Sequence, residues 1–202
     1  MSALSRRALV RSSLVAAFAG CLPELWAQAG KPDPVVARTT SAGAGPQLRF
    51  IPEFLDELKL SRAYTLECAQ AMPAEKYEFR PVPEVRTFGQ QMVHLSEAVP
   101  GLYELFIEGK KAPTHPFSEG GKEPALAKEE VIARLGLGFD YVERAAAKLR
   151  DSALRQPTKI FGGREISKHR MLRFLLDHTT HHRGQTVVYL RLNRIQPPLY
   201  RA

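Results

Sequence analysis

The chain has 202 residues, of which 44% are hydrophobic, so one domain can bury a sizeable core without disulfide bonds. Lysine and arginine outnumber aspartate and glutamate by 29 to 21, a net charge of +8, but basic and acidic residues are interspersed, as in Lys122-Glu123. A nucleic-acid-binding protein clusters its basic residues on one face, so this pattern argues against nucleic acid as a partner.

Residues 1–29 have the pattern of an export signal. Arg6-Arg7 is typical of a twin-arginine signal, and the apolar run from Leu14 to Leu22 is too short to span a bilayer. Ala27-Gln28-Ala29 offers small residues to a signal peptidase, so we expect cleavage after Ala29 and a periplasmic protein. The alternatives are a general secretory signal and a lipoprotein anchored at Cys21, because Phe18-Ala19-Gly20-Cys21 resembles a lipobox.

Residues 30–46 are rich in Pro, Gly, Ala, Ser and Thr and have no hydrophobic period, which predicts a flexible linker. We expect one domain over residues 47–202, without a transmembrane segment. Once the signal is removed, Cys68 is unpaired, and a lone helix cysteine is usually a small core residue.

Hydrophobic periodicity and breakers predict four amphipathic helices, over residues 47–72, from Thr87 to about 108, from about 128 to 151, and from Ile166 to about 193. Thr87-Phe88-Gly89-Gln90 has the form of a capping box. Residues 109–127 form a long loop that crosses or covers one end, and residues 156–164 form an extended or hairpin-like connection. The sequence therefore predicts an all-α fold, a four-helix bundle with long crossover connections.

The strongest chemical signal is the run from Asp177 to Gln185 in the fourth helix. Successive helical residues turn by about 100°, so His178 and His182 project from one face and can bind one metal ion together. They interrupt a stripe of core-facing residues: Met171, Phe174, Leu175, Gln185, Tyr189 and Leu192. The spacing alone leaves open that they are ordinary helix histidines, one hydrogen-bonded and one solvated. His181, at the edge of the stripe, is an alternative ligand or a residue that supports a ligand.

The other histidines give weaker signals. His94 lies about 110° from the centre of the apolar stripe of the second helix, so its position alone indicates an exposed or edge residue. His169 points away from the His178 face, and His115 lies in the long loop without an identifiable partner.

The stretch from Leu175 to Tyr200 combines an H-x-x-x-H-R-G-Q run with a Pro-Pro-Leu-Tyr ending. It resembles the C-terminal helix of the DinB-like superfamily, also called the YfiT-like metal-dependent hydrolases. The segment from Met72 to Leu95 is similar to an upstream part of that family, in the expected order and at the expected separation. The resemblance implies a four-helix bundle whose open end holds one divalent metal through His94, His178 and His182.

The implied ligand set favours a catalytic site, because three histidines leave coordination positions open whereas structural zinc sites are usually closed by four protein ligands. The ion can be zinc, nickel, iron or manganese, since imidazole suits several metals. Gln185 and Glu97 each lie near an implied ligand on the same helix and are candidates to hydrogen-bond it, although each can equally be an exposed polar residue.

Activities in the family include transfer of low-molecular-weight thiols onto electrophiles and a thiol-dependent isomerisation. The resemblance therefore implies a metal-dependent transferase or hydrolase that acts on a small molecule, with a low-molecular-weight thiol as a candidate partner. The alternative is a metal-binding stress-response protein without turnover. The sequence identifies no catalytic acid or base, and apolar outer faces are compatible with a homodimer.

Overall fold

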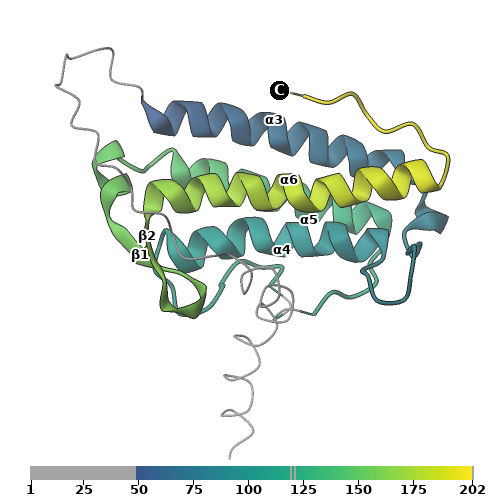
Figure 1. Cartoon of the computed structure of the whole chain (residues 1–202), viewed down its shortest axis with the longest axis horizontal. Helices are drawn as coiled ribbons and strands as arrows, with labels where there is room; N and C mark the ends of the chain where they lie inside the picture. Colours follow the sequence, from purple (N-terminus) through teal and green to yellow (C-terminus); the bar gives the residue numbers. More distant parts are fainter. Residues whose placement is uncertain (1–48, 119, 121, 202) are drawn as a thin grey trace, which may run out of the picture. The chain divides into compact units, whose positions relative to one another are not determined.

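A computed structural model describes residues 49–118, 120 and 122–201 (Figure 1). The predicted signal (1–29) and linker (30–46) lie outside the described residues. The unit described below contains the described residues from Phe50 onward except Gly120 and Lys122. None of its helices is long and apolar enough to cross a membrane.

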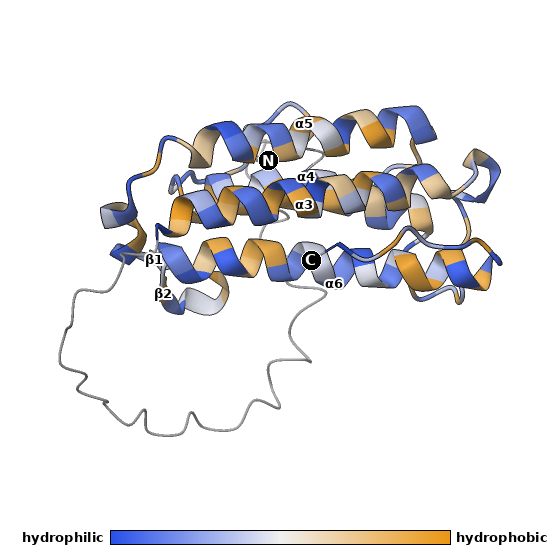
Figure 2. Ribbon diagram, turned by 90° about the horizontal axis from the view of Figure 1, so that it is seen from above, coloured by the Kyte–Doolittle hydropathy of each residue, from blue (hydrophilic) through white to orange (hydrophobic). Residues whose placement is uncertain are grey.

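Four α-helices make up most of this unit: α3 (Phe50–Ala71), α4 (Phe88–Phe106), α5 (Lys128–Ala146) and α6 (Lys168–Leu192). Each helix mixes hydrophobic and hydrophilic residues along its length (Figure 2). The side-by-side pairs are α4 with α5, α5 with α3, α3 with α6 and α6 with α4. Because α3 and α4 are diagonal to each other, as are α5 and α6, the chain crosses an end of the bundle twice. The predicted four-helix bundle with crossover connections is confirmed.

The helix ends follow local hydrogen bonding. At α4 the predicted capping box is present, with Gln90 N donating to Thr87 Oγ1 at 3.1 Å and Thr87 N to Gln90 Oε1 at 2.9 Å. The predicted third helix is too long: α5 ends at Ala146 rather than residue 151. Lys148 N and Leu149 N bond to the carbonyls three residues back, at 3.2 and 2.9 Å, which tightens the chain out of the α-helix.

Two further boundaries differ from the prediction. The first helix begins at Phe50 rather than residue 47. The last helix begins at Lys168 rather than Ile166, because Ser167 Oγ accepts from Arg170 N at 3.2 Å and caps it. The apolar stripe of that helix stops short of Leu192, which is 56% exposed.

A short 3₁₀ turn, η1 (Ala74–Lys76), lies between α3 and α4. A second 3₁₀ turn, η2 (Asp151–Arg155), and a β-hairpin connect α5 to α6. Strands β1 (Pro157–Lys159) and β2 (Glu165–Ser167) pair antiparallel, with Thr158 opposite Ile166. The turn between them, η3 (Phe161–Gly163), has φ of +71° at Gly162 and +77° at Gly163, which only glycine adopts readily. The expected hairpin-like connection is confirmed.

Gly138 lets α5 approach α4 closely. A Cβ at this position would lie 3.0 Å from the carbonyl oxygen of Ser96 and 3.3 Å from Cδ of Pro100. The glycine that weakens the helix in isolation is therefore required for packing of the two helices.

Cys68 is fully buried, as expected, and burial raises the pKa of its thiol to about 12.

Glu104 anchors the loop that follows α4. Its side chain is 1% exposed and accepts hydrogen bonds from Lys110 Nζ at 2.6 Å, Thr114 N at 2.7 Å, Thr114 Oγ1 at 2.8 Å, Tyr141 OH at 3.0 Å and His115 N at 3.2 Å. Burial alone would raise the pKa of this carboxyl, but the donors together lower it from 4.5 to about 2. The carboxylate thus ties the loop to the bundle in its ionised form.

Glu104→Gln is expected to lower the free energy of unfolding by about 3 kcal/mol at neutral pH, because the ionised carboxylate is held by charge-assisted bonds. A group with a depressed pKa stabilises the fold above its unfolded pKa, and this contribution disappears as the pH falls from about 4.5 towards 2. Urea unfolding at pH 7 and pH 3 measures both effects. The control Glu108→Gln, at a side chain 31% exposed, should cost far less; equal losses would contradict the anchor.

Candidate metal centre

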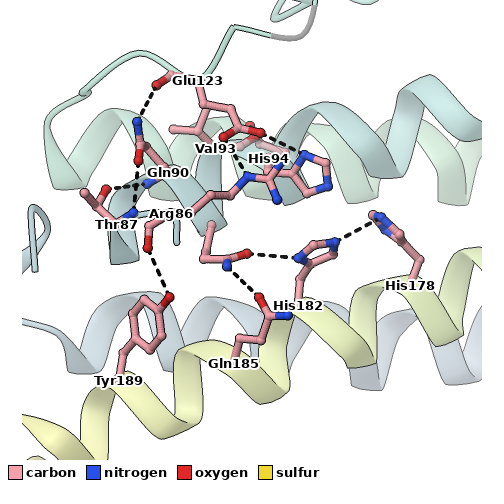
Figure 3. A network of polar contacts seen from close by, with 12 residues as sticks. Arg86, Thr87, Gln90, Val93, His94, Glu123, His178, His182, Gln185 and Tyr189 are labelled. Atoms are coloured by element: carbon pink, nitrogen blue, oxygen red, sulfur yellow. Dashed lines mark hydrogen bonds and ion pairs between the residues drawn. The ribbon is translucent and has the colours of Figure 1, made fainter. Parts of the chain in front are cut away.

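Three histidines from two helices converge at one point between α4 and α6 (Figure 3). His178 and His182 project from successive turns of α6 with their Nε2 atoms 3.1 Å apart. His94 faces them from α4, with its ring centroid 5.3 Å from that of His178 and 4.4 Å from that of His182. One nitrogen of each ring lies within 4.8 Å of the others. Nitrogen ligands of a tetrahedral zinc ion are about 3.3 Å apart, so the spacing fits a shared ion.

The position of His94 differs from the helical-wheel expectation. Its side chain is only 14% exposed, although the wheel placed it on an exposed or edge face. The same face carries Gln91 and Glu97, which are 3% and 8% exposed. α4 packs against both α5 and α6, and loop residues cover Gly101, with His115 Nε2 at 3.6 Å from an ideal Cβ there. The polar face of α4 is therefore an interior face.

The outer nitrogens of two of these rings are held by acceptors. His94 Nδ1 lies 3.1 Å from Glu123 Oε1, and His182 Nδ1 lies 2.9 Å from Gln91 Oε1. Both contacts favour the tautomer with the proton on Nδ1, which leaves the Nε2 lone pair available to a metal. The amide of Gln91 is oriented in turn, because its Nε2 donates to Gln185 Oε1 at 2.5 Å.

His178 is held differently. Its Nδ1 is buried and has no hydrogen-bond partner among the described residues. Phe174, one turn earlier on α6, packs against its ring with a centroid separation of 6.0 Å. The orientation of His178 is thus set by packing alone, and its Nε2 points to His182. A metal shared with His182 would bind this ring at Nε2, while Nδ1 would keep only its packing contacts with the described residues.

The electrostatic environment keeps all three imidazoles neutral at pH 7. Burial, the neighbouring histidines and Arg86 together lower the pKa of His178 to about 3 and that of His182 to about 2, with burial the largest cause. Burial also lowers the pKa of His94, against the opposing effect of Glu123. Metal ions bind the neutral form of histidine. The protonation state of the three rings is therefore suited to metal binding, as their arrangement is.

Glu123 links the site to the loop between α4 and α5. Besides the contact with His94, its Oε2 accepts from Arg86 Nε at 2.6 Å, and its backbone carbonyl lies 3.4 Å from Gln90 Nε2. The carbonyl of Arg86 accepts from Tyr189 OH of α6 at 3.0 Å. Burial would raise the pKa of Glu123, but His94 and Arg86 lower it, so the carboxylate is ionised beside the site.

The remaining predicted residues occupy peripheral positions. Gln185 contacts Gln91 rather than a histidine of the cluster, and its Nε2 lies 3.0 Å from His181 Nε2. His181 is exposed, packs edge-on against His182 at 4.9 Å, and does not join the group of three. Glu97 is buried one turn beyond His94 and is also outside that group.

The two other described histidines lie elsewhere. The ring of His169 packs in a tilted arrangement against Phe50, with ring centroids 4.1 Å apart. His115, predicted to have no partner, is 6% exposed, and its ring packs against Phe117 at 5.2 Å. Neither belongs to the cluster of potential ligands.

Sequence comparison gives one family. The sequence model of the DinB superfamily matches residues 57–186, a range that contains all three clustered histidines. A search of curated protein sequences finds no significant match.

Solved structures share the fold at low sequence identity. A DinB-like protein from Bacillus cereus superposes with a TM-score of 0.62 at 20% identity, over 75% of this chain and 97% of that one. A DinB-like protein from Bacillus subtilis gives 0.59 at 16% identity, over 74% and 97%. The mycothiol-dependent maleylpyruvate isomerase gives 0.53 at 13% identity, over 68% of this chain and 62% of that one. These similarities support the helical-bundle fold.

Proposed function

Because the chain belongs to the DinB superfamily, we propose that it binds one divalent metal ion through His94, His178 and His182 and acts as a metal-dependent transferase or hydrolase. The convergence of three neutral imidazoles, two of them oriented by acceptors on their outer nitrogens, carries this proposal. Three protein ligands leave coordination positions for water or a substrate.

The residues around the histidines have separate tasks in this proposal. A divalent ion, when bound, supplies Lewis acidity and favours the deprotonated form of a thiol or water at the site. Gln91 and Glu123 hold the rings of His182 and His94 in place. The charge of Arg86 lowers the pKa of all three histidines, so the same charge stabilises an anionic group among them.

A low-molecular-weight thiol is the substrate class we favour. The mycothiol-dependent maleylpyruvate isomerase has a similar fold, and its name identifies a thiol cosubstrate for that protein. In this chain the only described cysteine is fully buried with a raised thiol pKa, so a reactive sulfur at the site has to come from a ligand. The three histidines do not select among zinc, nickel, iron and manganese.

Removal of the metal is expected to abolish turnover. Protein treated with a chelator should lose activity in a screen of thiols and electrophiles, and restoring the ion found in the purified protein should recover it. Circular dichroism checks that the helices persist. Activity that survives in folded, metal-free protein would contradict the proposal, whereas metal binding without any turnover would favour a non-catalytic metal-binding role.

We propose that the protein is exported through the twin-arginine route, with the support of Arg6-Arg7 and Ala27-Gln28-Ala29. Replacing both arginines by lysine should leave the full-length chain in the cytoplasm, which cell fractionation measures. Normal arrival of the double variant in the periplasm would indicate a general secretory signal instead. Lipid labelling that depends on Cys21 would identify a lipoprotein.

A further inference from the structure

The segment after α6 folds back along α3 and encloses a groove. Figure 1 shows this last segment, in yellow, running beside α3. Tyr200 packs edge-on against Tyr64 of α3 at 5.9 Å, and Arg201 pairs with Glu67. A cavity of about 460 Å³ lies between α3, α6 and this segment. We call it the C-terminal groove.

The C-terminal groove is separate from the histidine cluster. It is lined on α6 by residues that include Thr180, Gly184 and Val187, which recur at helical spacing along one face. Each residue turns the helix by about 100°, so His178 and His182 lie on the opposite face. One face of α6 therefore carries His178 and His182, next to α4. The opposite face lines the C-terminal groove, together with the segment that follows α6.

A buried arginine is the central feature of this groove. Arg183 is 5% exposed, and its Nη1 donates to Ser61 Oγ at 2.9 Å and to the Ser61 carbonyl at 3.4 Å. Its Nη2 donates to Thr180 Oγ1 at 3.2 Å, and its guanidinium carbon lies 4.7 Å from the ring centroid of Tyr64. All these partners are neutral, and no carboxylate in the described part of the chain forms an ion pair with Arg183. A guanidinium has five N–H donors, so some remain for a ligand.

The lining of the groove complements an anion with a flat apolar part. It includes a second arginine, Arg191, and no acidic residue. Pro197, Leu199 and Tyr200 add apolar surface, and Leu199 and Tyr200 are 84% and 73% exposed at its rim. A buried charge is costly without an opposite charge, so an anionic ligand would satisfy Arg183 while the rings pack on its apolar part.

We propose that the C-terminal groove binds a small aromatic carboxylate, with Arg183 on the carboxylate and Tyr64 and Tyr200 against the aromatic ring. A guanidinium matches a carboxylate with two parallel hydrogen bonds, which a neutral amide cannot reproduce. The cavity volume of about 460 Å³ is that of a small-molecule site. This site does not depend on the metal centre.

Benzoate and its neutral analogue benzamide test the proposal by NMR titration of the full-length chain. Benzoate should bind saturably, and benzamide about tenfold more weakly, because it lacks the charge that Arg183 recognises. Arg183→Gln should weaken benzoate binding by about tenfold or more, whereas Arg170→Gln, an exposed arginine of α6 outside the groove, should bind as the unmodified protein does. Chelated protein should bind benzoate unchanged.

Three results would overturn the proposal: no saturable binding of benzoate, equal binding of benzoate and benzamide, or full benzoate affinity in Arg183→Gln. Loss of benzoate binding on chelation would place the carboxylate at the histidines instead. If Arg183→Gln does not fold, the exposed variants Arg191→Gln and Tyr200→Ala decide, since both should weaken benzoate binding severalfold and full affinity in both would contradict the site.

Discussion

Alanine at His94, His178 or His182 is expected to reduce metal occupancy from about one ion per chain to a small fraction of that value. Each substitution removes one of three protein ligands, and losing a ligand should cost more affinity than the 10–100-fold typical of a residue that only supports one. Elemental analysis of the purified variants measures occupancy. Circular dichroism confirms that the four helices remain.

The other histidines provide matched controls for this experiment. His115→Ala and His169→Ala should retain the metal, because neither ring belongs to the cluster. His181→Ala should also retain it, since His181 is exposed and contacts Gln185. Full occupancy in both His178→Ala and His182→Ala would refute the site, and a loss in His181→Ala as large as in His182→Ala would identify His181 as the ligand on α6.

The periodic parts of this chain could be predicted because their signals are local. The spacing of His178 and His182 follows from the helical repeat, and the Thr87–Gln90 capping box fixes the start of α4. The predicted end of the third helix, at residue 151, was wrong because the three-residue turns at Lys148 and Leu149 do not follow from the apolar period of the sequence. Such turns depend on how the chain has to leave the bundle.

The helical wheel misplaced His94 for a related reason. A wheel assumes that one face of a helix meets solvent, but α4 has α5 on one side, α6 on another and the loop around His115 over Gly101. The resemblance of Met72–Leu95 to the family supplied what the wheel could not. Gln91 shares the face of His94, so a search for amides on that face would have found it.

Glu123 could not be found from spacing at all. It lies in the loop between α4 and α5, and its distance from His94 in the sequence has no helical relation to the site. Only the fold of the loop brings its carboxylate to His94 Nδ1 and to Arg86 Nε. Long-range placement of this kind follows from tertiary packing, which a single sequence does not encode in a periodic signal.

Gln91→Ala and Glu123→Ala are each expected to weaken metal binding by about 10–100-fold while leaving the three histidines in place. Each change removes the acceptor that holds an outer imidazole nitrogen, on His182 for Gln91 and on His94 for Glu123. Without it, the ring loses both its fixed tautomer and its orientation. A competition titration with a chromophoric chelator measures the dissociation constants.

A graded series separates this effect from general destabilisation. Gln185→Ala should cost less affinity than Gln91→Ala, because Gln185 orients Gln91 and contacts none of the three clustered histidines. Glu123→Gln should lose less than Glu123→Ala, since an amide oxygen still accepts from His94 Nδ1 but lacks the charge that pairs with Arg86. Glu129→Gln, an exposed position on α5, should bind metal as the unmodified protein does. If Gln91→Ala and Glu123→Ala bind metal as tightly as Glu129→Gln, then the histidines are oriented by the bundle alone.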